Sequence, residues 1–174
     1  MMAFWDDYTV SMKKRALLAL IIMLPAVWLH FWAASKLFYS LSPSLGYKLF
    51  WTTPISQNDE IKPGDYVVFP APVKEYNRLA SMNLSESTKA MKQVKCISGQ
   101  KLTVQGVNYY CDSVLLGTAK PTTLSGKPLS QFVYDGTIPE GKLFVMGTHR
   151  DSFDSRYLGF IDKNTVTATG TPLM

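Results

Sequence analysis

The feature that most constrains the fold of this chain is an apolar segment without formal charge near its N-terminus, Ala16–Ala34. As a helix it would be about 28 Å long at roughly 1.5 Å per residue, close to the thickness of the hydrocarbon core of a bilayer. Pro25 lies inside it, but a single proline is tolerated in a membrane helix. The segment therefore predicts one transmembrane helix over residues 16–35.

Basic residues flank this segment unequally, because Lys13–Arg15 precede it and Lys36 alone follows it. By the positive-inside rule, residues 1–15 are expected to stay in the cytoplasm, and residues 36–174 are expected to be exported as one domain. A cleavable signal peptide is the alternative, since Ala33–Ser35 resembles a small-residue cleavage site. Both interpretations export the domain.

The net charge of +5 gives little support to nucleic-acid binding, because the basic residues are scattered rather than clustered with aromatic residues. A basic exported domain lying beside anionic lipid is the simpler interpretation. Cys96 and Cys111 are the two cysteines. An even count in an oxidising compartment favours a disulfide that closes a loop of about fifteen residues, with two buried free thiols as the alternative. His30 and His149 are the only histidines, so neither a metal nor a cofactor is expected.

Beyond the apolar segment, short runs of β-branched and aromatic residues are separated by Gly, Pro and Asn, which predicts one mainly β domain. Residues 75–90 are interpreted as a short helix or a mobile excursion, and residues 118–131 as a long surface loop. The predicted strands are Tyr66–Phe69, Met91–Ile97, Lys101–Gln105, Asn108–Cys111, Leu143–Gly147 and Thr165–Thr169.

Three serines alternate just after the apolar segment, at Ser40, Ser42 and Ser44. In an extended segment they would point to one side. Serines two residues apart can supply a nucleophile and a donor to the oxyanion together. An ordinary juxtamembrane linker is the alternative interpretation.

Lys92 is the second candidate, because on a strand it shares its face with the apolar Val94 and Cys96. Burial disfavours the charged form of a lysine and lowers its pKa. The neutral amine can then accept a proton from a serine near pH 7. A solvated lysine is the alternative.

The segment Met146–Phe160 is dense in Asp, Arg and Ser directly after an apolar run, which is hard to explain as core or as a solvated face; a charged surface loop is the alternative interpretation. Its core, Asp154–Phe160, resembles the C-terminal signature of type I signal peptidases, Ser-x-Asp-Ser-Arg-Tyr-x-Gly. The serine segment, the Gly64–Phe69 strand and the lysine strand ending at Ile97–Gln100 precede it in the order of that family. The resemblance implies a signal-peptidase-like β domain behind one transmembrane helix.

Within the family, the chain resembles the TraF-type peptidases of conjugative transfer. The small size, the Lys-Gln-Val-x-Cys spacing with a second cysteine downstream, and the compact Ser-Phe-Asp-Ser-Arg-Tyr run carry this resemblance. The chain departs from that branch at Gly46, Lys48 and Phe50, where Pro, Gly and Tyr would be expected. Thr148 and His149 replace the usual Asp-Asn, and we assign them no catalytic role.

The resemblance implies a role for each matching residue. Ser44 matches the nucleophile and Lys92 the general base. Ser42 matches the side-chain donor of the oxyanion hole, beside the backbone N–H of Ser44, and Ser152 matches the hydroxyl that orients the lysine amine. The residues that match the structural box are Asp154, Ser155 and Arg156.

The implied protein is a serine endopeptidase of the bacterial inner membrane, single-pass, with its catalytic domain in the periplasm. Its implied partners are an exported protein or pilin precursor, membrane lipid and subunits of a secretion machine, with pilin maturation in a conjugative type IV secretion system as the expected function. Release by water or cyclisation of the pilin are both open. The alternatives are an inactive homologue that acts as an assembly subunit, and a general type I signal peptidase.

Overall fold

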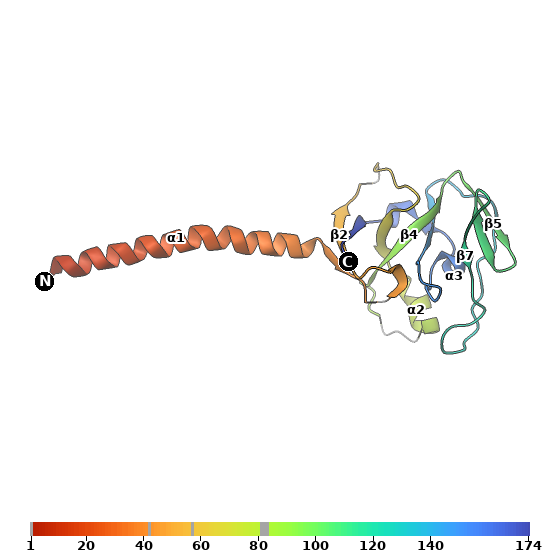
Figure 1. Cartoon of the computed structure of the whole chain (residues 1–174), viewed down its shortest axis with the longest axis horizontal. Helices are drawn as coiled ribbons and strands as arrows, with labels where there is room; N and C mark the ends of the chain where they lie inside the picture. Colours follow the sequence, from red (N-terminus) through yellow and green to blue (C-terminus); the bar gives the residue numbers. More distant parts are fainter. Residues whose placement is uncertain (1, 42, 57, 81–83) are drawn as a thin grey trace. The chain divides into compact units, whose positions relative to one another are not determined.

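The computed structural model describes residues 2–41, 43–56, 58–80 and 84–174 of the chain. It divides into two compact units, of which the first ends at Leu37 and the second is Phe38–Met174. The first unit is almost entirely one helix, and the second is the β domain (Figure 1).

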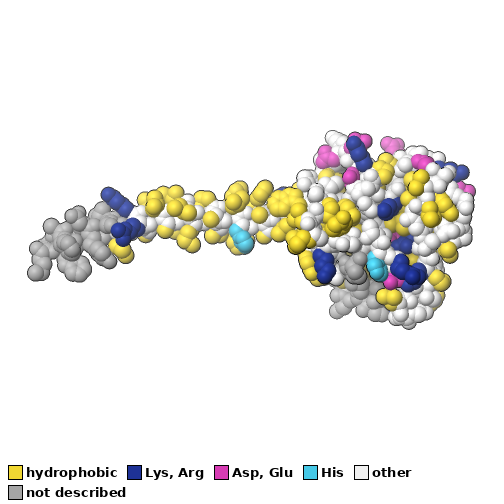
Figure 2. Space-filling view, viewed as in Figure 1, with side chains coloured by type: hydrophobic (Ala, Val, Ile, Leu, Met, Phe, Trp, Pro, Cys, Tyr) yellow, Lys and Arg dark blue, Asp and Glu magenta, His cyan; other side chains and the backbone are white. Residues whose placement is uncertain are grey.

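Helix α1 runs over Met2–Ser35 and contains the whole predicted transmembrane segment. Its part Lys14–Ser35, 22 residues with a mean hydropathy of 2.1, is long and apolar enough to cross a membrane. Figure 2 shows basic side chains where this part begins and hydrophobic side chains along the rest of it. Because residues before Ala16 are also helical, the predicted boundary at residue 15 is a change in composition and not in backbone conformation.

The β domain contains two antiparallel sheets. The larger has seven strands in the order β1-β2-β11-β3-β4-β9-β10, and the smaller has four in the order β7-β6-β5-β8. The strands of the larger sheet are β1 Leu37–Tyr39, β2 Leu49–Pro54, β11 Ala168–Pro172, β3 Tyr66–Pro70, β4 Lys89–Ile97, β9 Lys142–Met146 and β10 Ile161–Asp162. Those of the smaller sheet are β7 Val114–Thr118, β6 Asn108–Cys111, β5 Lys101–Gln105 and β8 Asp135–Thr137.

Short helical segments connect these strands: η1 Pro43–Leu45, α2 Val73–Ala80, α3 Ser155–Leu158 and η2 Lys163–Thr165. Helix α2 falls at the start of the region interpreted as a short helix or an excursion. The strand predicted at 165–169 is wrong in position, because β11 begins at Ala168. The carboxylate of Asp162 accepts the N–H of Asn164, and this cap holds the following residues in a helical turn.

Strand β4 is an interior strand of the larger sheet and pairs with β3 along one edge and with β9 along the other. Lys92 faces Val67 of β3, and Val94 faces Val145 of β9. A bulge between Val94 and Cys96 shifts the register against β9. As a result Val94 packs in one apolar cluster and Cys96 in another.

Cys96 and Cys111 form a disulfide, as the sequence predicted. The bond joins β4 of the larger sheet to β6 of the smaller one, and both cysteines are buried. They lie in the apolar cluster that also holds Tyr109 and Phe144, whose rings stack with centroids 5.5 Å apart. The cross-link therefore joins the strand that carries Lys92 to the smaller sheet.

Candidate active site

The lysine of β4 is buried in the domain. Lys92 is only 5% exposed, and its neighbours across the sheet are on β3 and β9. Burial lowers the pKa of Lys92 to about 8; the carboxylate of Asp154 acts against this shift, and the guanidinium of Arg156 reinforces it. An amine with such a pKa is partly neutral at neutral pH, which a proton acceptor requires.

Ser44 is the partner of this amine. Its Oγ lies 3.1 Å from Nζ of Lys92, and the residue itself is 7% exposed. Ser44 occupies the 3-10 turn η1, so the serine segment is not extended up to this residue. Ser42, predicted to help form the oxyanion hole, lies outside the described residues.

The backbone of Ser44 is held by the segment that follows β9. Its carbonyl oxygen accepts the N–H of His149 at 3.1 Å and the hydroxyl of Thr148 at 3.4 Å. Both residues had been assigned no catalytic role, and the structure places them as supports of the serine. The contact joins residues 104 positions apart, so sequence spacing alone could not have found it.

Gly147 makes this close approach possible. A Cβ at this position would lie 2.6 Å from the carbonyl oxygen of Ser44 and would overlap the side chain of Ser152. Any side chain here would therefore displace the serine turn, Ser152 or both. In the sequence this glycine is the end of a predicted strand and belongs to the segment Met146–Phe160, without a role of its own.

Asp154 and Arg156 form the structural pair that the resemblance implied. Both are buried, and Nε and Nη2 of Arg156 donate to the carboxylate of Asp154 at 2.9 and 2.8 Å. The same carboxylate accepts the N–H of Gly147 at 2.9 Å, and Ser155 Oγ accepts the N–H of Val145 at 3.0 Å. These bonds attach the final box to the end of β9, beside the serine.

Ser152 is 4% exposed and lines the same cleft as Ser44 and Lys92. Its hydroxyl has no hydrogen-bond partner among the described residues. Nζ of Lys92 donates a hydrogen bond to Oγ of Ser44 and not to this hydroxyl. The role of Ser152 in orienting the lysine therefore stays a prediction.

The serine and the lysine lie in a cleft of about 350 Å³. One part of its wall is Phe38–Leu41 with the beginning of β4, and another is the segment 149–153. Tyr76 of α2 donates its hydroxyl to the carbonyl of Phe153 at 2.9 Å. Burial raises the pKa of Tyr76 above its usual range, so this hydroxyl stays protonated and keeps its hydrogen bond.

A serine hydroxyl at hydrogen-bond distance from a buried amine, with both residues lining one cleft, is the arrangement of a serine peptidase whose general base is a lysine. The family profile described as "Signal peptidase, peptidase S26" matches residues 10–173. The chain therefore belongs to the signal peptidase family S26, and it is a serine peptidase with a signal-peptidase-like β domain and an apolar N-terminal helix that fits a membrane anchor.

Among solved structures, a signal peptidase I from Enterococcus faecalis V583 is similar to this chain. The match has 21% identity and a TM-score of 0.39, and it covers 62% of this chain and 94% of that chain. Comparison with curated proteins gives no match. Among the described residues, no group of three or more His, Cys, Asp or Glu side chains could hold a metal ion.

Proposed function

We propose that this peptidase cleaves exported precursors with Ser44 as nucleophile and Lys92 as general base. The observation that carries the proposal is the 3.1 Å separation between Ser44 Oγ and Lys92 Nζ, at a lysine that is 5% exposed. Burial supplies the neutral amine, and the contact supplies the path for the proton.

In the first step, neutral Lys92 accepts the hydroxyl proton of Ser44 while Oγ attacks the carbonyl carbon of the substrate. The resulting oxyanion is stabilised by the backbone N–H of Ser44 and, as the family resemblance implies, by the hydroxyl of Ser42. The ammonium of Lys92 then passes its proton to the leaving amine, the C–N bond breaks, and an ester to Ser44 remains. Lys92 is neutral again and can assist the second step.

In the second step, water attacks the ester, Lys92 takes one of its protons, and Ser44 leaves with that proton. If the amino terminus of the same substrate attacks in place of water, the product is a cyclic peptide. The resemblance to the TraF-type branch motivates this second outcome, and it points to a pilin precursor of a conjugative type IV secretion system as the substrate. A small residue, typically alanine, is the family's expectation at the cleaved bond.

We place the catalytic domain on the periplasmic side of the bacterial inner membrane. Two observations support this proposal: Lys13–Arg15 precede the apolar part of α1, and the Cys96–Cys111 disulfide is typical of an oxidising compartment. Membrane lipid and subunits of the secretion machine are then its expected neighbours.

Intact-mass measurement of a candidate pilin, produced with and without the peptidase, tests the proposal. We expect the precursor to be shortened only when the peptidase is present, and a product lighter than the linear form by one water molecule would show ring closure. Ser44→Ala should leave the precursor uncut. Ser98→Ala is the matched control, because the hydroxyl of this serine donates to the carbonyl of Lys142 and the residue does not line the cleft.

Two outcomes would contradict the proposal in different ways. Cleavage that persists in Ser44→Ala would remove the assigned nucleophile. An uncut pilin in the wild-type strain, together with loss of pili on deletion of the gene, would support an assembly role.

A further inference from the structure

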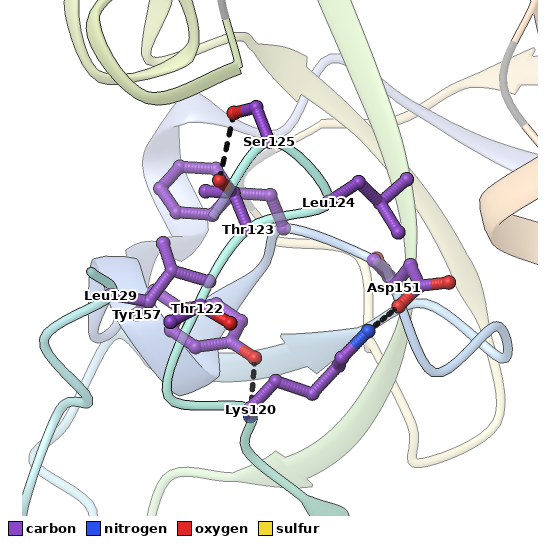
Figure 3. Close-up of a pocket in the computed structure, with 10 residues that line it drawn as sticks. Lys120, Thr122, Thr123, Leu124, Ser125, Leu129, Asp151 and Tyr157 are labelled. Carbon is purple, nitrogen blue, oxygen red and sulfur yellow. Dashed lines mark hydrogen bonds and ion pairs between the residues drawn. The ribbon is translucent and has the colours of Figure 1, made fainter. Parts of the chain in front are cut away.

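A second cavity, of about 210 Å³, adjoins the cleft that holds the serine and the lysine (Figure 3). Four residues line both spaces: Leu124, Asp151, Ser152 and Phe153. Neither Ser44 nor Lys92 lines the second cavity. It therefore continues the cleft on the side of segment 151–153, away from the reacting atoms.

The outer wall of this cavity is an ordered hairpin in the connection between β7 and β8, where the sequence predicted a long loop. Thr122 and Pro128 form a bridge, and the N–H of Leu129 bonds to the carbonyl of Pro121 at 2.8 Å. Leu124 lies near the tip of this hairpin and is 83% exposed, although its side chain faces the cavity.

The base of the hairpin is fastened to the box that supports the active site. The N–H of Lys120 donates to the Tyr157 hydroxyl at 2.8 Å, and the ammonium of Lys120 pairs with the carboxylate of Asp151, as Figure 3 shows. Nη1 of Arg156 also donates to the carbonyl of Thr118 at 2.6 Å. A wall that is fixed in advance loses little conformational freedom when a ligand binds.

The lining of the cavity selects for an uncharged group. Its two charged residues, Lys120 and Asp151, neutralise each other, with side chains only 27% and 22% exposed. Leu124, Leu129 and Phe153 supply apolar surface. An apolar cavity of about 150 Å³ holds a benzene ring, so a cavity of about 210 Å³ has room for one bulky side chain.

We propose that this cavity is a substrate subsite that holds one aliphatic or aromatic side chain, at a position that does not adjoin the cleaved bond. The occupant belongs to the substrate because the cavity continues the catalytic cleft through four shared residues. A polypeptide in the cleft would cover Leu124 and remove it from water, which stabilises the complex. The inference rests on the proposed cleavage at Ser44, and the following experiments separate the two.

The first experiment measures the cleavage-site profile of the full-length protein in detergent on synthetic peptides of mixed sequence. We expect enrichment of Leu, Ile or Phe at one position away from the cleaved bond. Leu124→Asp should reduce cleavage of those peptides 10- to 200-fold relative to peptides with Ser or Gly there, the range for one apolar contact in a pocket. Val133→Asp is the matched control, since Val133 is 68% exposed in the same connection and lines neither space.

A profile without apolar enrichment away from the cleaved bond would overturn the subsite, and so would an enrichment that Leu124→Asp leaves unchanged. Cleavage that survives Ser44→Ala would refute the proposed function and leave the profile as evidence on the subsite.

The second experiment does not depend on cleavage. Ser44→Ala protein is irradiated with peptides that carry benzoylphenylalanine at each position in turn, and the cross-linked residues are mapped by mass spectrometry. Cross-links to residues 120–129 from one position support the subsite, and cross-links only elsewhere overturn it. Competition by phosphatidylglycerol vesicles but not by unlabelled peptide would assign the cavity to a lipid acyl chain, and would also overturn the inference.

Discussion

We expect Lys92→Met to abolish peptide cleavage and at the same time to stabilise the protein near neutral pH. Methionine has a similar shape but no charge, so it fills the buried position without the cost of desolvating an ammonium. If Lys92 were retained only because it stabilises the fold, Lys92→Met would instead lower the stability of the protein.

The magnitude follows from the pKa of Lys92, which burial lowers from 10.5 to about 8. Between these values the unfolded chain binds more protons than the folded protein, so the wild type gains stability as pH rises through this window. At pH 7 the lysine is protonated in the unfolded chain and mostly so in the folded protein. The penalty is then about 3 kcal/mol, at about 1.4 kcal/mol for each pH unit of difference, and it falls to about 1 kcal/mol near pH 10.

The assay is thermal unfolding of the full chain in detergent at pH 7 and pH 10. For a domain of this size, about 3 kcal/mol corresponds to a rise in Tm of roughly 10 °C at pH 7, and we expect a much smaller difference at pH 10. Lys89→Met is the matched control, because Lys89 is an exposed lysine on the same strand. A surface substitution of this kind should change stability by less than about 0.5 kcal/mol. If Lys92→Met were no more stable than the wild type, or its gain did not depend on pH, the amine would not be held in a site that disfavours its charge.

Three further predictions follow from the same geometry. The kcat/KM for a peptide substrate should rise with pH and reach half of its plateau near pH 8, where Lys92 loses its proton; a rate independent of pH between 6 and 9 would argue against a lysine base. Gly147→Ala should lower kcat/KM about 100-fold, a typical effect of displacing a catalytic group by about 1 Å, because its Cβ would lie 2.6 Å from the carbonyl oxygen of Ser44; circular dichroism would check that the fold is retained, and full activity would show that the serine turn has room to move. Replacing Cys96 and Cys111 together by alanine should lower the free energy of unfolding by about 3 kcal/mol, measured by urea titration; unchanged stability would mean that the two sheets hold together without the cross-link.

The sequence predicted Lys92 correctly as a buried residue because a strand has a simple period. Side chains two apart share a face, so the apolar Val94 and Cys96 indicated the direction of the lysine. The bulge beside them could not be predicted, since it depends on how β9 pairs with β4. The two-residue period of the strand therefore predicted which side chains are buried, but it did not predict in which apolar cluster each of them packs.

The serine turn shows the opposite case. The alternating serines would share one side only in an extended segment, but residues Pro43–Leu45 form a 3-10 turn. The carbonyl of Ser44 bonds to Thr148 and His149, far away in the chain, and such tertiary contacts override local preference. The hairpin over residues 121–129 was missed for a related reason, because Lys120 and Tyr157 fasten it from outside the loop.

The structural box Asp154–Arg156 holds the backbone near the serine, and its charged side chains also affect the pKa of Lys92. An unpaired carboxylate at Asp154 would favour the ammonium form of Lys92 and raise its pKa. Arg156 donates two side-chain bonds to that carboxylate, and its own positive charge opposes the ammonium. The two charges of the pair therefore act on Lys92 in opposite directions, and desolvation, the largest cause, determines the direction of the shift. Lys92 and the box form one electrostatic unit, in which the ion pair holds the turn in place and leaves the amine free to lose its proton.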